Sequence, residues 1–270
     1  TTPPMTEPLR IAWLTTGRGP GSYGAFEALT RAIEDGLPVD VAVMFLNRER
    51  GEFEATDRLI DYAKGCGTPV ETLSSVAFRK SRGAARSKAG EALPAWRAEY
   101  DAAVAEQLGA YDFQLGVMFG YMLIATEALH GGFTFINDHP ALPDGPVGTY
   151  QEVICELIRS RACESGCMMN VVTSDVDRGP AISFCRYPLT GNGIDELWAE
   201  TDTSAPREAL QQTALYAEIR RRGVERERPF LVETLRAIAE RRLEVPPVAA
   251  VDLTEAVERA VATDGKQWLR

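Results

Sequence analysis

Two side chains of catalytic type, Asn137 and His139, stand one residue apart where the apolar run FTFI enters a polar loop. In an extended strand, residues two apart project to the same side, so this amide and this imidazole can converge on one small pocket. An imidazole can carry a proton near neutral pH, which makes His139 a candidate acid or base. The spacing alone fits equally well a loop histidine whose nitrogens are satisfied by the backbone.

The only other histidine, His130, precedes two glycines in EALHGG and is expected to cap the C-terminal end of a helix. His139 is therefore the histidine expected to do chemistry. A second polar loop, SDVDRGP, carries Asp175 and Asp177 between two apolar runs. Aspartate and glycine are ordinary turn residues, so this loop by itself favours a turn over a site.

A glycine-rich segment, GRGPGS at residues 17–22, follows the first apolar run and precedes a helical pattern with Phe26, Leu29 and Ile33 on one face. A strand, a glycine loop and a helix in this order bring backbone amides and a helix N-terminus together, which suits a phosphate group. The spacing matches neither GxGxxG in its dinucleotide context nor GxxxxGK[ST]. A tight turn without a ligand is an equal alternative.

Apolar runs alternate with helical patterns along most of the chain. Strands are expected at 9–16, 39–46, 69–73 and 113–119, and helices at 54–64, 91–108 and 148–161. This alternation predicts an α/β fold with a mostly parallel, twisted, Rossmann-like sheet whose ligands bind at the carboxyl ends of the strands.

The C-terminal half departs from this alternation. Apolar runs at 167–173 and 181–187 have no long crossover between them and should form an antiparallel pair. Helices are expected at 205–222 and 228–241, with an amphipathic stretch at 253–261 and no strand signal after residue 203. We therefore predict an α/β core over residues 9–200 and a C-terminal helical segment over 201–270 that packs on this core.

The composition, with a net charge of −10 over 270 residues and 45% hydrophobic residues, is that of an ordinary globular protein. An acidic chain does not suit a general binder of nucleic acid or anionic membranes, and no apolar run reaches the ~18 residues of a membrane span. Five cysteines without CxxC spacing fit reduced thiols in the cytoplasm. A basic run at 79–88 is more typical of a mobile solvated loop than of a phosphate-binding patch.

Five segments, in the same order, resemble motifs of the folate-dependent formyltransferases, most closely the phosphoribosylglycinamide formyltransferase family. FINDHPALP is similar to that family's Asn-Ile-His-Pro-Ser segment, and TSDVDRGPAI to its Thr-Asp-x-x-Asp-x-Gly-Pro loop. Weaker similarities are GPGSYGAFEAL to a Gly-Ser-Asn phosphate loop, RAEYD at 97–101, and FGYMLI at 119–124 to Gly-Phe-Met-Arg-Ile. The resemblance covers about residues 9–245.

This resemblance implies transfer of a formyl group from 10-formyltetrahydrofolate to an amine, with Asn137, His139 and Asp177 as catalytic residues and no metal. It implies that the folate is bordered by Arg97, Met122, Leu123, Ile124, Ala125 and Asn137. It implies that an acceptor phosphate is held by Gly21, Ser22 and Tyr23. The leading acceptor is glycinamide ribonucleotide of purine biosynthesis, and a homodimer is compatible with these expectations.

The departures from the family pattern concern the acceptor more than the donor. Tyr23 and Leu123 stand where the family usually has asparagine and arginine, and the segments at 141–148 and 166–170 are altered. The family's glutamate before a helical proline falls on Val224, with Glu225 one residue away. Three alternatives therefore stay open: a formyltransferase for another amine, a formyltetrahydrofolate hydrolase, and a noncatalytic folate-binding or phosphate-binding homologue.

Overall fold

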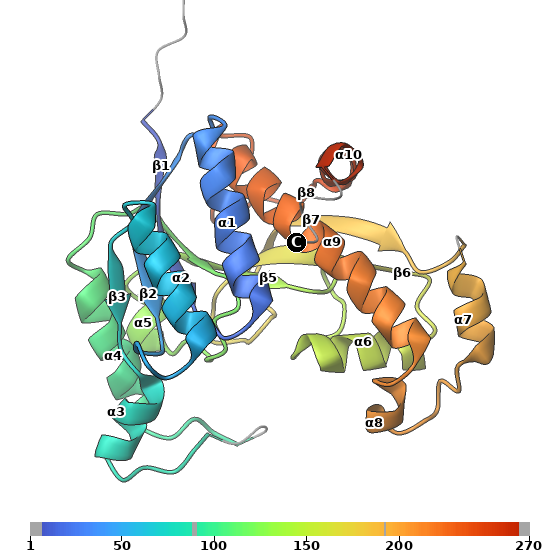
Figure 1. Ribbon diagram of the computed structural model, residues 1–270, viewed down its shortest axis with the longest axis horizontal. Coiled ribbons are helices and arrows are strands. Elements are labelled where there is room, and N and C mark those ends of the chain that lie inside the picture. The colour runs from blue at the N-terminus through green and yellow to red at the C-terminus, as the bar shows by residue number, and fades with distance from the viewer. Residues whose placement is uncertain (1–6, 88–90, 192, 265–270) are drawn as a thin grey trace, which may run out of the picture. The chain divides into compact units, whose positions relative to one another are not determined.

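The computed structural model describes residues 7–87, 91–191 and 193–264 (Figure 1). Lys88, in the predicted basic run, lies outside them. The chain divides into two compact units, the first formed by Thr1–Asn137 and Val171–Asp175 and the second by Asp138–Asn170 and Val176–Arg270. None of the described helices is long and apolar enough to cross a membrane.

The first unit is a parallel sheet with helices on both faces. Its strands are β1 (Leu9–Thr15), β2 (Val39–Leu46), β3 (Val70–Thr72), β4 (Leu115–Met118) and β5 (Phe135–His139), in the order β3-β2-β1-β4-β5. All of these neighbours pair in parallel. The helices are α1 (Pro20–Glu34), α2 (Glu54–Gly65), α3 (Ser75–Ser81), α4 (Trp96–Leu108) and α5 (Glu127–His130). The last two residues of β5 belong to the second unit.

The alternation of side chains along β1 explains how this sheet is covered. The ring of Trp13 packs against Phe26 of α1, with ring centroids 5.6 Å apart. Leu14, on the other side of the strand, belongs to a buried cluster with Tyr100 and Val104 of α4. Because successive residues of a strand point to opposite faces, α1 and α4 cover opposite faces of the sheet.

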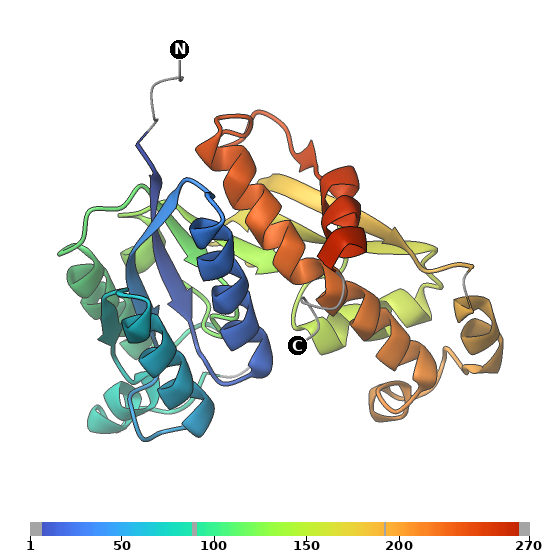
Figure 2. The ribbon, with the colours of Figure 1, turned by 45° about the horizontal axis from the view of Figure 1, so that its top comes forward.

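The second unit contains β6 (Glu164–Val171), β7 (Ala181–Pro188) and β8 (Val251–Asp252), of which β6 and β7 are antiparallel and β7 and β8 parallel. Its helices are α6 (Tyr150–Arg159), α7 (Ile194–Glu200), α8 (Arg207–Leu210), α9 (Ala214–Ala239) and α10 (Thr254–Asp264). Thr149 and Glu152 form a reciprocal capping box that starts α6. Residues of α6 and α9 share one buried apolar cluster, and Figure 2 shows α10 alongside α9.

The predicted fold class, a mostly parallel α/β sheet with an antiparallel pair, is confirmed. Several details were wrong. The helix predicted at 91–108 begins at Trp96, since Pro94 disfavours helical conformation in the residue before it. Part of the basic run is the helix α3, whose first turn is capped by the Ser74 hydroxyl. The short strand β8 lies in a segment where no strand was predicted.

The two helices predicted at 205–222 and 228–241 are largely one helix, α9, which continues through Gly223 and Pro229. Apolar residues are buried along its length, from Leu215 to Leu235. The tertiary contacts of these side chains outweigh the local preference of glycine and proline to end a helix. At Gly223 a Cβ atom would lie 3.1 Å from the hydroxyl of Tyr187, so a small residue allows this approach.

Candidate active site

His139, the last residue of β5, is held at both ring nitrogens within the second unit. Its side chain is 2% exposed, its Nδ1 lies 3.5 Å from Oδ1 of Asp177, and its Nε2 lies 2.8 Å from the carbonyl oxygen of Pro146. A carbonyl can only accept a hydrogen bond, so Nε2 carries the proton donated to Pro146. Nδ1 is therefore the nitrogen that gains or loses a proton, and when it is protonated the ring forms an ion pair with Asp177.

Asp177 is positioned by the backbone around it. Its φ of 56° lies in the left-handed region, which aspartate tolerates better than most residues. Its Oδ2 accepts a hydrogen bond from the amide of Gly148 at 3.1 Å. Gly148 has a φ of 101°, and a Cβ atom there would lie 2.6 Å from Oε2 of Glu152, so glycine is required. The carboxylate thus joins the segment 146–148 to the histidine.

Asp138, between the two predicted catalytic residues of β5, forms a charged group with Glu227 and Arg220 of α9 that the sequence analysis missed. Nη1 of Arg220 lies 2.6 Å from Oε1 of Glu227. Asp138 is half-buried as a residue, yet its Oδ1 is inaccessible and has no hydrogen-bond partner among the described residues. Burial raises the pKa of Asp138 well above its usual range, Glu227 raises it further, and Arg220 lowers it. The signal in the sequence was an acidic residue inside a strand, facing away from His139.

Asn137 pairs in register with Met118 of β4 and is half-buried. It belongs to the first compact unit, whereas His139 and Asp177 belong to the second. The structure therefore brings His139 and Asp177 together within one unit, and it places Asn137 two residues before His139 in the same strand. The backbone of Asp175, the other aspartate of the SDVDRGP loop, forms a local turn with the Thr173 hydroxyl: its amide donates to this hydroxyl, and its carbonyl oxygen accepts from it.

Gly21, Ser22 and Tyr23 form the first turn of α1. No side chain caps this turn, whose N-cap is Gly19 and which has a proline at its start. The ring of Tyr23 packs on Tyr62 of α2, with ring centroids 5.1 Å apart. Arg18, the nearest cation in sequence, lies over the ring of Phe53. In the part of the chain that the structure describes, the first-turn amides thus have no side-chain acceptor, and the Tyr23 ring packs on α2.

The segment from Met122 to Ala125 alternates between outward and inward side chains in the first unit. Met122 and Ile124 are 67% and 43% exposed, whereas Leu123 packs against the buried cluster below and Ala125 is buried within it. Arg97 is buried, and its guanidinium donates a hydrogen bond to the carbonyl oxygen of Ile124 at 2.6 Å. Five of the six residues predicted to border the folate, Arg97 and the segment 122–125, are therefore adjacent, with Arg97 beneath the segment. The sixth, Asn137, lies in β5.

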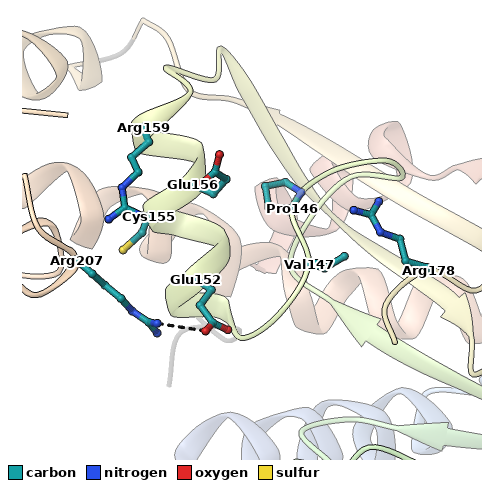
Figure 3. Close-up of a pocket in the computed structure, with 8 residues that line it drawn as sticks. All are labelled: Pro146, Val147, Glu152, Cys155, Glu156, Arg159, Arg178 and Arg207. Carbon is teal, nitrogen blue, oxygen red and sulfur yellow. Dashed lines mark hydrogen bonds and ion pairs between the residues drawn. The ribbon is translucent and has the colours of Figure 1, made fainter. Parts of the chain in front are cut away.

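A cavity of about 430 Å³ lies beside α6 in the second unit (Figure 3). Its lining is mostly charged and consists of Pro146, Val147, Glu152, Cys155, Glu156, Arg159, Arg178 and Arg207. Arg207 pairs with Glu152 at 3.2 Å. None of the described residues predicted as catalytic lines this cavity. It touches their surroundings through Pro146 and Val147, beside the backbone that holds His139, and through Arg178, which follows Asp177 in the chain.

Comparisons with known proteins give no match to a family model and none among the curated proteins. Solved structures do match. Glycinamide ribonucleotide transformylase 1 from Symbiobacterium toebii has a TM-score of 0.60 at 24% identity, over 87% of this chain and 90% of that chain. Phosphoribosylglycinamide formyltransferase from Coxiella burnetii has a TM-score of 0.57 at 20% identity, over 87% and 89% of the two chains.

Glycinamide ribonucleotide transformylase 1 from Geobacillus kaustophilus has a TM-score of 0.55 at 21% identity, over 86% of this chain and 98% of that chain. Further structures of the same type, at 16–19% identity, are among the matches. The resemblance inferred from the motifs is confirmed at the level of the fold. The chain has the α/β fold of the phosphoribosylglycinamide formyltransferases.

Proposed function

We propose that this protein transfers a formyl group from 10-formyltetrahydrofolate to the amine of a small acceptor. The observation that carries the proposal is the buried imidazole of His139, at the end of a strand, with the Asp177 carboxylate 3.5 Å from its Nδ1. The similarity of the fold to that of formyltransferases supports the same function. The proposal assigns Asn137, His139 and Asp177 as the catalytic residues.

The donor supplies the formyl carbon that the acceptor amine attacks. Asn137, two residues before His139 in β5, donates a hydrogen bond to the formyl oxygen as negative charge grows there, and loss of one such donor typically costs ~10²–10³ in rate. The protonated imidazole of His139, paired with the Asp177 carboxylate, supplies positive charge that stabilises the same oxygen. The attacking amine loses a proton, and the donor nitrogen gains one as it releases the formyl group. His139 and Asp177 also help to move this proton.

The segment 122–125 suits the flat ring of a folate. Met122 and Ile124 offer exposed apolar side chains, and within the described part of the chain no hydrogen bond uses the main-chain N–H or C=O of Leu123. An apolar platform beside unpaired main-chain groups fits a planar ring with polar edges. These observations support the assignment of Met122, Leu123, Ile124 and Ala125 to the donor.

The first turn of α1 suits an acceptor that carries a phosphate. Among the described residues no side chain caps the amides of Gly21 and Ser22, and an uncapped helix start favours an anion. Glycinamide ribonucleotide is the leading candidate, in which case the pathway is purine biosynthesis. Tyr23 would contribute its amide, since its ring packs on Tyr62. A cytoplasmic location and a homodimer stay predictions.

Incubation with 10-formyltetrahydrofolate, with and without glycinamide ribonucleotide, tests the function. Release of the deformylated folate only when the amine is present is the expected result. Release without the amine would instead identify a hydrolase. An absence of release together with measurable folate binding would identify a binding protein, and a panel of other amines would then test whether only the acceptor was wrong.

A further inference from the structure

Two oppositely charged residues of α4, Arg97 and Asp101, are buried one helical turn apart in the first unit. Arg97 is 2% exposed and Asp101 is fully buried, and Nη2 of Arg97 lies 3.8 Å from Oδ1 of Asp101. Burying two charges costs desolvation energy that their attraction often fails to offset, so such a pair is weak evidence for a role in stability. A role in holding other groups in place is the stronger explanation.

Both charged side chains hold the backbone of the segment that follows Gly120. Arg97 donates to the carbonyl oxygen of Ile124 at 2.6 Å, and Asp101 accepts from the amide of Thr126 at 2.6 Å. A third hydrogen bond joins the amide of Met122 to the hydroxyl of Thr16 at 2.9 Å. The backbone is thus held at every second residue, 122, 124 and 126, and two of the three bonds are charge-assisted.

These bonds keep exposed two apolar side chains that would otherwise gain by burial. Met122 and Ile124 stay open to solvent, although burial of apolar side chains is favourable. Leu123 and Ala125 point into the core on the other side of the segment. A free loop would turn its apolar side chains inward, whereas this backbone is fixed from below by α4.

We propose that Arg97 and Asp101 are positioning residues that fix the segment 121–126 in the shape that binds the formyl donor, without touching the donor themselves. The part that concerns the donor rests on the proposed function. The mechanical part, that the two side chains hold the backbone of 121–126, does not rest on that function, because it predicts the local rigidity of this segment in the ligand-free protein.

Amide hydrogen exchange over residues 121–126 tests the mechanical part. In Arg97→Lys, which keeps the charge but loses the planar fork, and in Asp101→Ala, which removes the acceptor of the Thr126 amide, we expect the hydrogen-bonded amides of Met122 and Thr126 to exchange about 10–100-fold faster. Glu99→Gln is the matched control, since Glu99 lies on the same helix and forms an exposed ion pair with Arg82. Wild-type exchange at 121–126 in both variants would overturn the proposal. If Asp101→Ala does not fold, Arg97→Lys alone decides.

Steady-state kinetics then test the link to the donor. We expect KM for the donor to rise about tenfold in Arg97→Lys, with kcat and KM for the acceptor within about twofold of wild type. A rise in the donor KM without faster exchange at 121–126 would show that Arg97 contacts the donor, and the positioning role would be rejected. The variants could instead show faster exchange at 121–126 while the wild-type protein transfers no formyl group. That outcome would reject the proposed function and leave the positioning role intact.

Discussion

At the scale of single residues, the candidate site depends on main-chain groups as much as on the side chains that suggested it. The imidazole of His139 is oriented by the carbonyl of Pro146, and the carboxylate of Asp177 by the amide of Gly148. The residue types at 139 and 177 could be recognised in the sequence. Their main-chain partners could not, because every residue carries a carbonyl and nearly every residue an amide, and only the fold selects which of them come close.

His139→Gln should lower kcat by about 10²–10⁴, because the amide can still donate a hydrogen bond to Pro146 but cannot carry a proton. The site is buried, so we also expect a loss of about 1–3 kcal/mol in the free energy of unfolding. His130→Gln is the control and should leave kcat nearly unchanged. Transfer assays and urea unfolding measure both effects. A large stability loss with little loss of rate would mean that His139 is structural.

Asp177→Asn separates the charge of this residue from its backbone role. Asparagine also tolerates a φ of 56°, and its amide oxygen can still accept from Gly148. The loss of charge beside Nδ1 should therefore lower the rate by about 10–1000-fold while leaving the fold intact. Asp175→Asn, in the same loop, serves as the control. Equal rates for the two variants would remove Asp177 from the catalytic residues.

The raised pKa of Asp138 makes a prediction about pH. Burial and Glu227 favour the protonated form in the folded state, whereas an unfolded carboxyl titrates near 3.9. The contribution of Asp138 to stability is therefore fully present below about pH 4 and is lost as the pH rises through its folded pKa. The variant Asp138→Asn does not titrate at this position. As the pH rises from about 4 through the folded pKa of Asp138, this variant should gain stability relative to wild type, by about 1.4 kcal/mol for each unit by which folding raises that pKa.

Urea unfolding of both proteins from pH 4 to pH 8 measures this difference. The groups that face Asp138 from α9 are Glu227 and Arg220, and neither is altered in the comparison. Asp144→Asn, an exposed aspartate of the same unit, is the control. Stability curves of Asp138→Asn and wild type that run parallel with pH would contradict the raised pKa.

At the scale of helices and strands, the parts that could be predicted are those whose pattern is local. The buried strands β1 and β2 were recognised because each is a mostly apolar run, interrupted by Arg10 in β1 and by Asp40 in β2, and is followed by a helical pattern. The long helix α9 was split in the prediction because Gly223 and Pro229 are local stop signals, and the contacts that override them come from distant residues. The two-residue strand β8 has no pattern of its own and exists through its pairing with β7.

The start of α1 allows a test of the phosphate assignment. Apart from the neighbouring backbone, no atom of the described residues lies within 4 Å of a Cβ placed at Gly21, and the first turn has no acidic residue. In Gly21→Asp the carboxylate should favour the helix by about 0.3–1 kcal/mol and at the same time occupy the anion position. We expect KM for a phosphorylated acceptor to rise at least about tenfold, while the size-matched Gly21→Ala stays close to wild type. Equal KM values for the two variants would argue against a phosphate at this helix.

At the scale of the whole molecule, the C-terminal segment is part of a core rather than a separate appendage. Leu215 and Ile219 of α9 share one buried cluster with Ile154 and Ile158 of α6, which is more than 50 residues earlier in the chain. The predicted boundary between residues 200 and 201 stays a prediction, and this cluster supports a segment that packs on the preceding residues. The second unit should therefore not fold without it.

Removal of residues 201–270 exposes the apolar face of α6, so we expect the shortened chain to lose the cooperative folding of its second unit and to aggregate. Burial of each large aliphatic side chain is worth about 1.5–3 kcal/mol, and whole domains are stable by only about 5–15 kcal/mol, so the loss of several α9 side chains is enough. Circular dichroism and size-exclusion chromatography of the shortened chain measure the effect, and co-expression of residues 201–270 should restore a compact, soluble complex. A shortened chain that is monomeric and unfolds cooperatively would show that α9 is dispensable for the core, and the helical segment would then be an independent addition to the fold.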